Sequence, residues 1–399
     1  MATASGIVIP QSAEDIAPSW VQQVLQKDLP GVTITDVHVE GSISQGEGIT
    51  SDIIAFDAVG IRNGVSQRYS LVAKVTDFKR PLTVMKEWSK DVQIQIDIAE
   101  VKFYSDVVPE LLSLATPSTE RKTGNEETHA STDSLVIPKC YFAATDPRSM
   151  VSVRVMENLK TQGFSIKPNR QSQSRDEMML AAGALAQLHG LSYRLELRSG
   201  VPLPERKRDW IRSLSDVIAG TMEILGPMYR EAVKKFAAAF PGQTSPDLIA
   251  RLEKLNIQHP MMEENPRLMV LSHGDPYGNN IMFKYAEDVL TDVRLVDWQA
   301  VSYLPPTYDL AFLFLCNASW DVFHHHRDAI LAHYHHKLME TLGTDESSGL
   351  QSYTLEQLKA DFKEDCPFGV FHCLVRFGGL HADRGLVRII QEIKEWGVI

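Results

Sequence analysis

The spacing of apolar residues changes partway along the chain, and this change limits the folds that the chain can adopt. In the first part, apolar and polar residues alternate over short stretches, which is typical of β-strands that bury one face. The Asn63-Gly64 dipeptide lies between two of these stretches and predicts a tight β-hairpin. Strands are predicted at residues 33–40, 52–59, 69–75, 135–143 and 150–156.

Helical spacing dominates the second part of the chain. Ser174 and Glu177 form a capping-box pattern ahead of an apolar stripe, and Thr354 and Gln357 form another. A helix is therefore predicted to begin after each pattern. Residues 210–240 also have the pattern of long helical material.

Two stretches of the N-terminal part are less regular. Residues 92–98 alternate like a strand, but residues 98–108 fit a helix, and we predict a helix for both. Residues 113–134 are polar without apolar periodicity, so a long flexible surface loop is expected there. The chain is expected to form an N-terminal lobe of residues 1–158 and a mostly helical C-terminal lobe of residues 159–399.

The composition excludes several classes of protein. A chain of 399 residues with 44% hydrophobic and 23% charged residues is typical of a globular protein. Its 51 acidic and 40 basic residues give a net charge of −11, which argues against nucleic acid or an anionic membrane surface as a partner. The longest apolar run, Leu310–Cys316, is far shorter than the roughly 20 residues of a membrane span.

The N-terminus and the cysteines indicate a cytoplasmic location. Residues 1–10 contain no Lys or Arg and no apolar core of useful length, so no signal peptide is expected. The 4 cysteines are scattered and form no C-x-x-C pair, which favours a reducing compartment and argues against structural zinc.

The most informative motif is His273-Gly274-Asp275 with Asn280 and, further on, Asp297. This is the spacing of a phosphotransferase catalytic loop, in which an Asp accepts a hydrogen bond from the attacking hydroxyl. Asn280 and Asp297 provide the oxygen ligands that Mg²⁺ prefers, and His273 is a candidate for fixing the loop geometry. Any one of these residues alone would also fit a tight turn with an Asn cap.

Upstream residues fit the same chemistry. Gly46, Gly48 and Ser51 lie between two predicted strands and are similar to a loop that covers phosphates with its backbone N–H groups. Lys74 ends a predicted strand, where a cation could hold the α- and β-phosphates, and Glu100 is its candidate partner. Considered alone, the glycines fit an ordinary turn and Lys74 fits a solvated strand end.

Six of the 13 histidines lie between His324 and His336. Imidazoles at helical spacing can share a metal ion, but one face of a helix with partly solvated histidines is the favoured interpretation. His189 ends an apolar helix stripe and is expected to be a hydrogen-bonded structural residue.

These motifs make the chain similar to a known family. It resembles the ecdysteroid-kinase-like, or CHK-kinase-like, branch of the aminoglycoside and choline phosphotransferase superfamily. Residues 273–283 carry the most specific part of the resemblance, and residues 155–159, 185–189 and 308–311 also match.

The resemblance implies an α+β, bilobal, protein-kinase-like fold, with a β-rich N-lobe with one helix against a mostly helical C-lobe. It implies a kinase that uses ATP and Mg²⁺ to phosphorylate the hydroxyl of a small-molecule alcohol. It also implies a role for each candidate residue: Asp275 as base, Asn280 and Asp297 as metal ligands, Lys74 paired with Glu100, and Met156, Glu157 and Asn158 as a hinge strand whose backbone meets the adenine.

The acceptor is open at this point. A sterol or another lipophilic alcohol is the leading candidate, and choline-like or aminoglycoside-like acceptors are the alternatives. A cationic acceptor would need acids such as Asp361, Glu364 and Asp365 in its pocket.

Pro276-Tyr277 departs from the family pattern, and the short interval after Asp297 leaves no room for a protein-kinase activation segment. A non-catalytic nucleotide-binding scaffold is disfavoured because every candidate residue is present.

Overall fold

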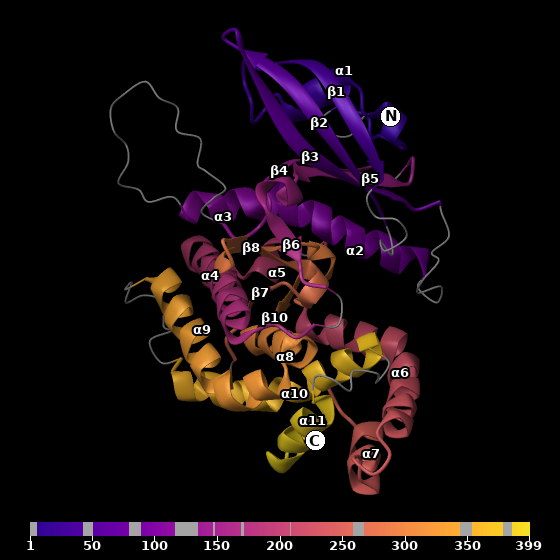
Figure 1. Ribbon diagram of the computed structural model, residues 1–399, viewed down its shortest axis with the longest axis vertical. Helices are drawn as coiled ribbons and strands as arrows, with labels where there is room; N and C mark the ends of the chain where they lie inside the picture. Colours follow the sequence, from indigo (N-terminus) through magenta and orange to yellow (C-terminus); the bar gives the residue numbers. More distant parts are fainter. Residues whose placement is uncertain are drawn as a thin grey trace. The chain divides into compact units, whose positions relative to one another are not determined.

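The computed structural model describes residues 6–42, 51–79, 89–115, 135–146, 148–168, 171–207, 209–257, 267–343, 353–377 and 385–399. Over these residues the chain forms two compact units, one ending at residue 164 and the other starting at residue 165 (Figure 1). Gly46 and Gly48 of the predicted glycine loop lie outside the described residues, and so does most of the loop predicted at 113–134.

The N-terminal unit is built on a five-stranded antiparallel sheet with the strand order β1-β2-β3-β5-β4. The predicted hairpin joins β2 to β3. Asn63 and Gly64 have φ angles of 52° and 77° there, the left-handed conformation that a two-residue hairpin turn requires. The strands are β1 (Thr33–Ser42), β2 (Asp52–Arg62), β3 (Val65–Asp77), β4 (Cys140–Asp146) and β5 (Val151–Glu157).

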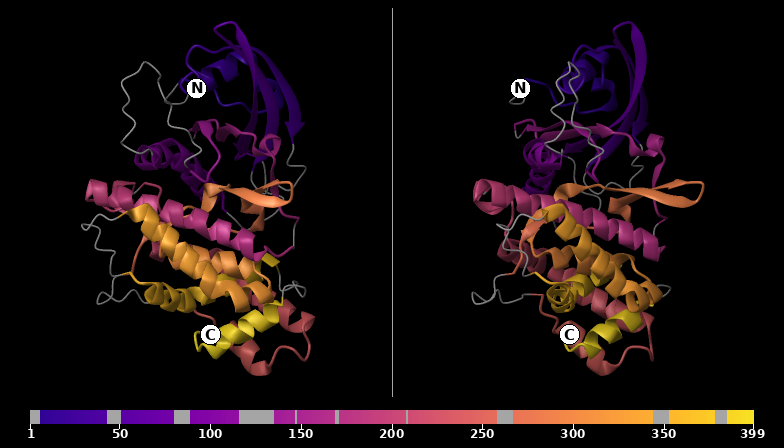
Figure 2. Two further views of the ribbon diagram at one scale, coloured as in Figure 1. Left: turned by 60° about the vertical axis from the view of Figure 1, so that its left-hand side comes forward. Right: turned by 90° about the vertical axis from the view of Figure 1, so that its left-hand side faces the viewer.

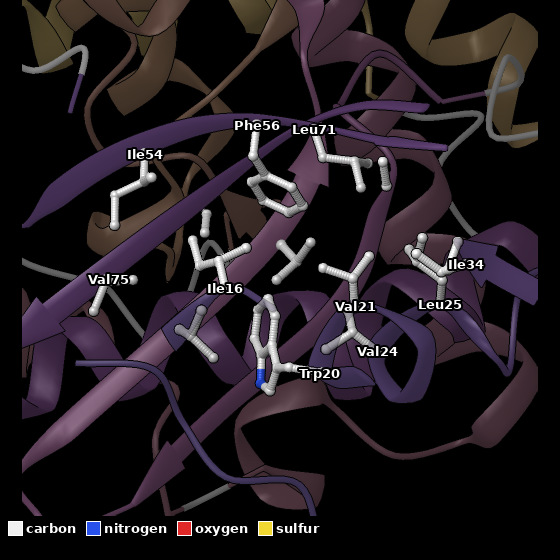
Figure 3. Packing of buried hydrophobic residues seen from close by; sticks show 14 of the residues in the cluster. Ile16, Trp20, Val21, Val24, Leu25, Ile34, Ile54, Phe56, Leu71 and Val75 are labelled. Carbon is white, nitrogen blue, oxygen red and sulfur yellow. The ribbon is translucent and has the colours of Figure 1, made fainter. Parts of the chain in front are cut away.

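The helix α1 packs its apolar face against this sheet. Trp20, Val21 and Val24 of α1 are buried in one cluster with Phe56 of β2 and Leu71 of β3 (Figure 3). This burial explains why so short a helix is stable, since most helix stability comes from packing. The helical elements of the unit are η1 (Ala13–Asp15), α1 (Pro18–Leu25), α2 (Lys90–Lys102), the π-helical turn η2 (Phe103–Val107), α3 (Val108–Ala115) and η4 (Leu159–Gln162).

Most of the elements predicted for this unit are confirmed, with three corrections. The helix predicted for 92–98 is confirmed as part of α2, whereas α1 and α3 were not expected. The strand predicted at 135–143 begins only at Cys140, because Pro138 has no N–H to donate to a neighbouring strand. Residues 113–115 are the last turn of α3 and not part of a loop.

The second unit is mostly helical, as predicted. It also contains a three-stranded sheet with the order β6-β8-β9 and a two-stranded antiparallel sheet of β7 and β10. The capping box is confirmed at the start of α4. At the start of α10, Thr354 Oγ1 accepts the backbone N–H of Gln357, but the Gln357 side chain donates to Asp361 instead of the cap backbone. The helices are α4 (Arg175–Ser199), α5 (Leu203–Arg206), α6 (Leu214–Ala239), α7 (Pro246–Glu253), α8 (Pro306–Asn317), α9 (Arg327–Leu342), α10 (Leu355–Phe377) and α11 (Leu386–Glu395).

The shorter elements of this unit surround the predicted motif. The strands are β6 (Phe164–Ile166), β7 (Val270–Ser272), β8 (Ile281–Ala286), β9 (Val289–Leu295) and β10 (Ser302–Leu304). The remaining helical turns are η5 (Gly278–Asn280), η6 (Trp298–Ala300) and η7 (Val322–His326).

Helix α8 is the centre of the second unit, since all of its residues are buried. It packs against α10, while α4 runs along α9 (Figure 2). Among the described helices, none is both long and apolar enough to cross a membrane.

The close contact of α8 with α10 predicts a glycine requirement. A Cβ atom added to Gly369 of α10 would lie 2.6 Å from the carbonyl oxygen of Ala311 in α8. The helices would have to separate, so Gly369→Ala is expected to lower the free energy of unfolding by about 2 kcal/mol. Gly220→Ala in α6 is the matched control, because no atom lies within 4 Å of its added Cβ.

The control should be neutral or stabilising by about 0.5 kcal/mol, because Ala reduces the freedom of the unfolded chain. Urea unfolding of both variants measures the difference. Equal stability of the two variants would contradict this account of the helix packing.

Candidate active site

The predicted catalytic loop connects β7 to the turn η5. Gly274 has a φ angle of 80°, and a Cβ atom there would lie 2.2 Å from the carbonyl oxygen of Ala300. Both observations require glycine at this position. The glycine of the His-Gly-Asp motif is therefore fixed by backbone geometry and by a neighbouring turn.

Asp309, in the first turn of α8, holds the backbone of this loop. Its carboxylate accepts the N–H of His273 at 2.7 Å and the N–H of Gly274 at 2.8 Å. His189 of α4 contacts the same carboxylate through Nε2 at 3.1 Å, and its Nδ1 lies 2.8 Å from the hydroxyl oxygen of Tyr334. His189 is thus a buried, hydrogen-bonded structural residue, as the sequence predicted.

His273 connects the loop to the residues that follow β9. Its Nε2 donates to the carbonyl oxygen of Val296 at 3.0 Å, and its Nδ1 accepts the backbone N–H of Asp275 at 3.3 Å. A carbonyl can only accept and an N–H can only donate, so these two bonds select the neutral Nε2–H form of the ring. The imidazole is buried and packs against Trp298.

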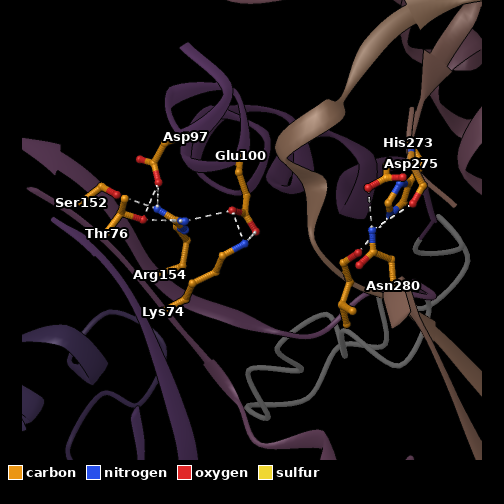
Figure 4. Close-up of polar contacts among 10 residues, drawn as sticks. Lys74, Thr76, Asp97, Glu100, Ser152, Arg154, His273, Asp275 and Asn280 are labelled. Carbon is orange, nitrogen blue, oxygen red and sulfur yellow. Dashed lines mark hydrogen bonds and ion pairs between the residues drawn. The ribbon is translucent and has the colours of Figure 1, made fainter. Parts of the chain in front are cut away.

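Asp275 is buried and bonded on both carboxylate oxygens. Asn280 Nδ2 lies 3.2 Å from Oδ2, and it also donates to the backbone carbonyl of Asp275 at 2.9 Å (Figure 4). Arg376 Nη2 lies 2.5 Å from Oδ1. Burial raises the pKa of Asp275 to about 7, the nearby Asp297 also raises it, and Arg376 opposes the shift.

Asp297 lies two residues after the end of β9, close to the strand end at which it was predicted, and has a left-handed backbone with a φ angle of 66°. Such a conformation is uncommon for a residue other than glycine, and it is frequent at functional sites. The backbone N–H of Val296, the residue before Asp297, donates to the carbonyl oxygen of Asn280 at 3.0 Å, and Ile281 pairs with Leu295 in the β8–β9 hairpin. The structure thus brings Asp275, Asn280 and Asp297 into one region of the second unit.

In the N-terminal unit, Lys74 of β3 and Glu100 of α2 form a buried ion pair. Lys74 Nζ lies 2.8 and 3.0 Å from the two carboxylate oxygens of Glu100. Arg154 of β5 also contacts Glu100, at 3.0 Å, and contacts Asp97 at 2.6 Å (Figure 4). Two cations and two carboxylates therefore balance in the interior, which offsets the cost of burying each charge.

Sequence reasoning missed Arg154 and Arg376. Arg154 lies between Val153 and Val155 in the buried part of β5, where an arginine requires an acidic partner. The valines on both sides of this arginine are therefore a signal in the sequence for a buried ion pair. Arg376 has no comparable signal, because only the packing of α10 brings it to the loop.

The other predicted residues lie at the edges of strands. Ser51 directly precedes β2 and is partly buried. Met156 and Glu157 end β5, and Asn158 caps the following turn. The N–H of Glu157 donates to Lys139 and that of Asn158 to Ser70, so both have protein acceptors. The hinge role of these residues stays a prediction.

The histidine-rich segment forms helix-surface contacts. His324 lies 2.8 Å from Glu392 and stacks on Trp320, and His335 contacts the carbonyl oxygen of Tyr353. Within the described ranges, no group of three or more His, Cys, Asp or Glu side chains is arranged to hold a metal ion.

Comparison with known proteins decides the family. The sequence model of the ecdysteroid kinase-like family matches residues 45–344. The chain belongs to the ecdysteroid kinase-like family. This kinase-like protein is accordingly a small-molecule phosphotransferase, and its mixed fold, with an antiparallel N-terminal sheet and a mostly helical second unit, is the fold class that the sequence predicted.

Similar solved structures are distant. The GDP complex of an aminoglycoside 2′-phosphotransferase-IIIa is 13% identical, with 95% of this chain and 97% of that chain covered and a TM-score of 0.41. Choline kinase LicA from Streptococcus pneumoniae is 12% identical, with coverages of 94% and 98% and a TM-score of 0.37. Likenesses this weak do not identify the substrate of the kinase-like protein. No curated protein matches its sequence.

The contacts of Asp309 lead to a prediction about the catalytic loop. In Asp309→Asn, one carboxylate oxygen becomes an NH₂ group, which cannot accept the N–H of His273 or Gly274. The free energy of unfolding should fall by about 2 kcal/mol, because a buried donor loses its acceptor. Asp328→Asn, an exposed acid on α9, is the control and should cost less than about 1 kcal/mol.

Thermal unfolding and phosphotransfer rates of both variants test this prediction. Activity should fall in Asp309→Asn even at temperatures where it is fully folded. A variant with wild-type stability and rate would show that the loop does not depend on Asp309.

Proposed function

We propose that the kinase-like protein transfers the γ-phosphate of ATP to a hydroxyl group of a lipophilic alcohol such as a sterol, with Mg²⁺ as cofactor. The observation that supports this most directly is the juxtaposition of Asp275 with Asn280 and Asp297. Phosphoryl transfer depends mainly on positioning and charge neutralisation, and these residues supply an acceptor for the hydroxyl proton beside oxygen donors for a metal.

Asp275 is the proposed base. Its backbone is fixed through His273, and its carboxylate is oriented by Asn280 and Arg376. A carboxylate held in this way can accept a hydrogen bond from an alcohol and take its proton as the new P–O bond forms.

Asn280 and Asp297 are the proposed ligands of Mg²⁺. Both hydrogen bonds of Asn280 to Asp275 use Nδ2, so the amide directs its oxygen to the other side. An amide oxygen and a carboxylate are hard donors, which fits Mg²⁺ better than Zn²⁺. When bound, the ion would neutralise charge on the phosphate oxygens.

Lys74 is the proposed contact for the α- and β-phosphates. Its ammonium group is positioned by Glu100, whose Oε2 also accepts a hydrogen bond from Arg154. Pre-positioning removes the cost of ordering a long flexible side chain when the nucleotide binds.

Two of the acids that a cationic acceptor would need already have partners within the protein. Asp365 is buried and paired with Arg267 at 2.6 Å, and Asp361 accepts hydrogen bonds from Tyr353 and Gln357. Of the three acids named for a cationic acceptor, only Asp365 is neutralised by a cation, and this removes one ligand that a choline-like or aminoglycoside-like acceptor would need. A non-catalytic scaffold gains no support, because Lys74, Glu100, Asp275, Asn280 and Asp297 are all present in the sequence.

The role of Asp275 predicts the effect of removing its charge. Asp275→Asn should lower kcat about 10²–10⁴-fold, the usual contribution of a general base. ATP affinity should stay close to that of the parent, because Asp275 is assigned to the alcohol. Mass spectrometry of phosphorylated products from a sterol panel, with calorimetric ATP binding, measures both quantities.

Asp288→Asn is the control for this experiment, because Asp288 lies in an exposed turn between β8 and β9. It should retain the parent rate. Phosphate transfer at the parent rate by Asp275→Asn would exclude the proposed mechanism.

The role of Lys74 predicts a defect in ATP use. Lys74→Met should raise the KM for ATP about tenfold or more, since a buried charge-assisted contact to phosphate is lost. Lys79→Met, at an exposed position after β3, is the control and should leave this KM unchanged. Initial rates at varied ATP concentrations decide between the outcomes, and an unaltered KM in Lys74→Met would remove Lys74 from the site.

A further inference from the structure

Arg376 brings a fixed positive charge to the proposed base. It lies on α10, and its Nη2 bonds Oδ1 of Asp275 at 2.5 Å. The side chain of Asp275 is 11% exposed and that of Arg376 is 27% exposed, so the contact lies at the edge of the interior. An arginine beside a base neutralises the charge by which that base would attract a cation.

The guanidinium also covers an aromatic surface. Arg376 Cζ lies 3.7 Å from the ring centroid of Tyr277 and 5.7 Å from that of Phe312. Aromatic faces beside a carboxylate are the usual binding surface for a quaternary ammonium group. Here the face of Tyr277 is already taken by the arginine.

The described residues that pack beside Arg376 on α10 are aromatic or neutral. His372 packs at a tilt against Phe312 and Phe368, and desolvation by burial together with the charge of Arg376 lowers its pKa to about 3. The neutral imidazole of His372 and the aromatic rings make the surroundings of Arg376 on α10 apolar, next to its ion pair with Asp275.

An acceptor alcohol that bonds Asp275 must lie close to the positive charge of Arg376. A hydroxyl that donates to a carboxylate oxygen of Asp275 lies about 2.7 Å from that oxygen. Since Arg376 bonds the same carboxylate, the carbon that bears the hydroxyl lies within roughly 8 Å of the guanidinium group. At this separation in a partly buried site, charges still interact appreciably.

We infer that Arg376 is a specificity-determining residue, which makes the site select uncharged or anionic alcohols over cationic ones. The inference rests on the proposed function, in which Asp275 meets the acceptor hydroxyl. Arg376 cancels the attraction of Asp275 for a cation, and it occupies the ring that would hold one. Among the described residues its side-chain hydrogen bond goes to Asp275, so further N–H donors can face an oxygen atom of the acceptor.

Two alcohols of the same shape and different charge test this inference. Choline and 3,3-dimethylbutan-1-ol differ in that the quaternary nitrogen of choline is replaced by carbon. Calorimetry measures the binding of each to the full-length protein without any need for turnover. The wild type should bind the neutral alcohol more tightly, and Arg376→Met should lower this preference about tenfold or more by improving the binding of choline.

Arg376→Lys and Arg388→Met complete the experiment. Arg376→Lys keeps the positive charge and should keep most of the preference, and it provides a test if Arg376→Met does not fold. Arg388→Met is the matched control, because Arg388 also lies over an aromatic ring, that of Trp320, but on α11. Its preference should equal that of the wild type.

Several outcomes would overturn the inference. These are equal binding of both alcohols by the wild type, binding of neither, or an unchanged preference in a folded Arg376→Met. The proposed function fails in a different way, through the absence of ATP-dependent phosphorylation of any alcohol. Because calorimetry measures binding without any phosphorylation, a failure of the inference can be distinguished from a failure of the proposed function.

Discussion

The contact between the Asp309 carboxylate and two consecutive backbone N–H groups is the interaction on which the second unit's candidate site depends. It fixes His273 and Gly274 from a helix whose residues are all buried. A loop held only by its own turns would sample many conformations, whereas a loop bonded to a rigid core element has one. The neutral ring of His273 then passes this order on to Asp275 and to the carbonyl of Val296.

The N-terminal unit achieves order by a different means, a charge-balanced cluster inside an apolar sheet. Glu100 is shared by Lys74 and Arg154, and Arg154 is also bonded to Asp97. Removing one member of such a cluster leaves an uncompensated charge in the interior, which costs more than the pair contributes. The cluster therefore constrains the position of Lys74 more strictly than an exposed ion pair would.

Sequence reasoning was most successful where the relevant interactions are local. The helix cap of α4, the Asn63-Gly64 hairpin and the loop that carries His273, Asp275 and Asn280 depend on residues close in the sequence, and these features were predictable. The late start of β4 also follows from a local signal, Pro138, which has no N–H to donate. Arg376 and the precise partners of Asp309 depend on the packing of helices far apart in the sequence, which periodicity does not determine. The roles of the candidate residues remain predictions for experiment.

The balance of charge around Asp275 connects the arginine to the proposed metal. Asp275 and Asp297 place two carboxylates near each other, and Arg376 compensates one of them. Burial and the second carboxylate both raise the pKa of Asp275, so a cation bound at Asp297 would stabilise the ionised form of Asp275. A divalent ion on Asp297 and Asn280 would lower the pKa of Asp275 and keep it ionised as a base. Since Arg376 occupies the other side of Asp275, the cation that completes the site is expected to be the metal and not a charged group of the alcohol.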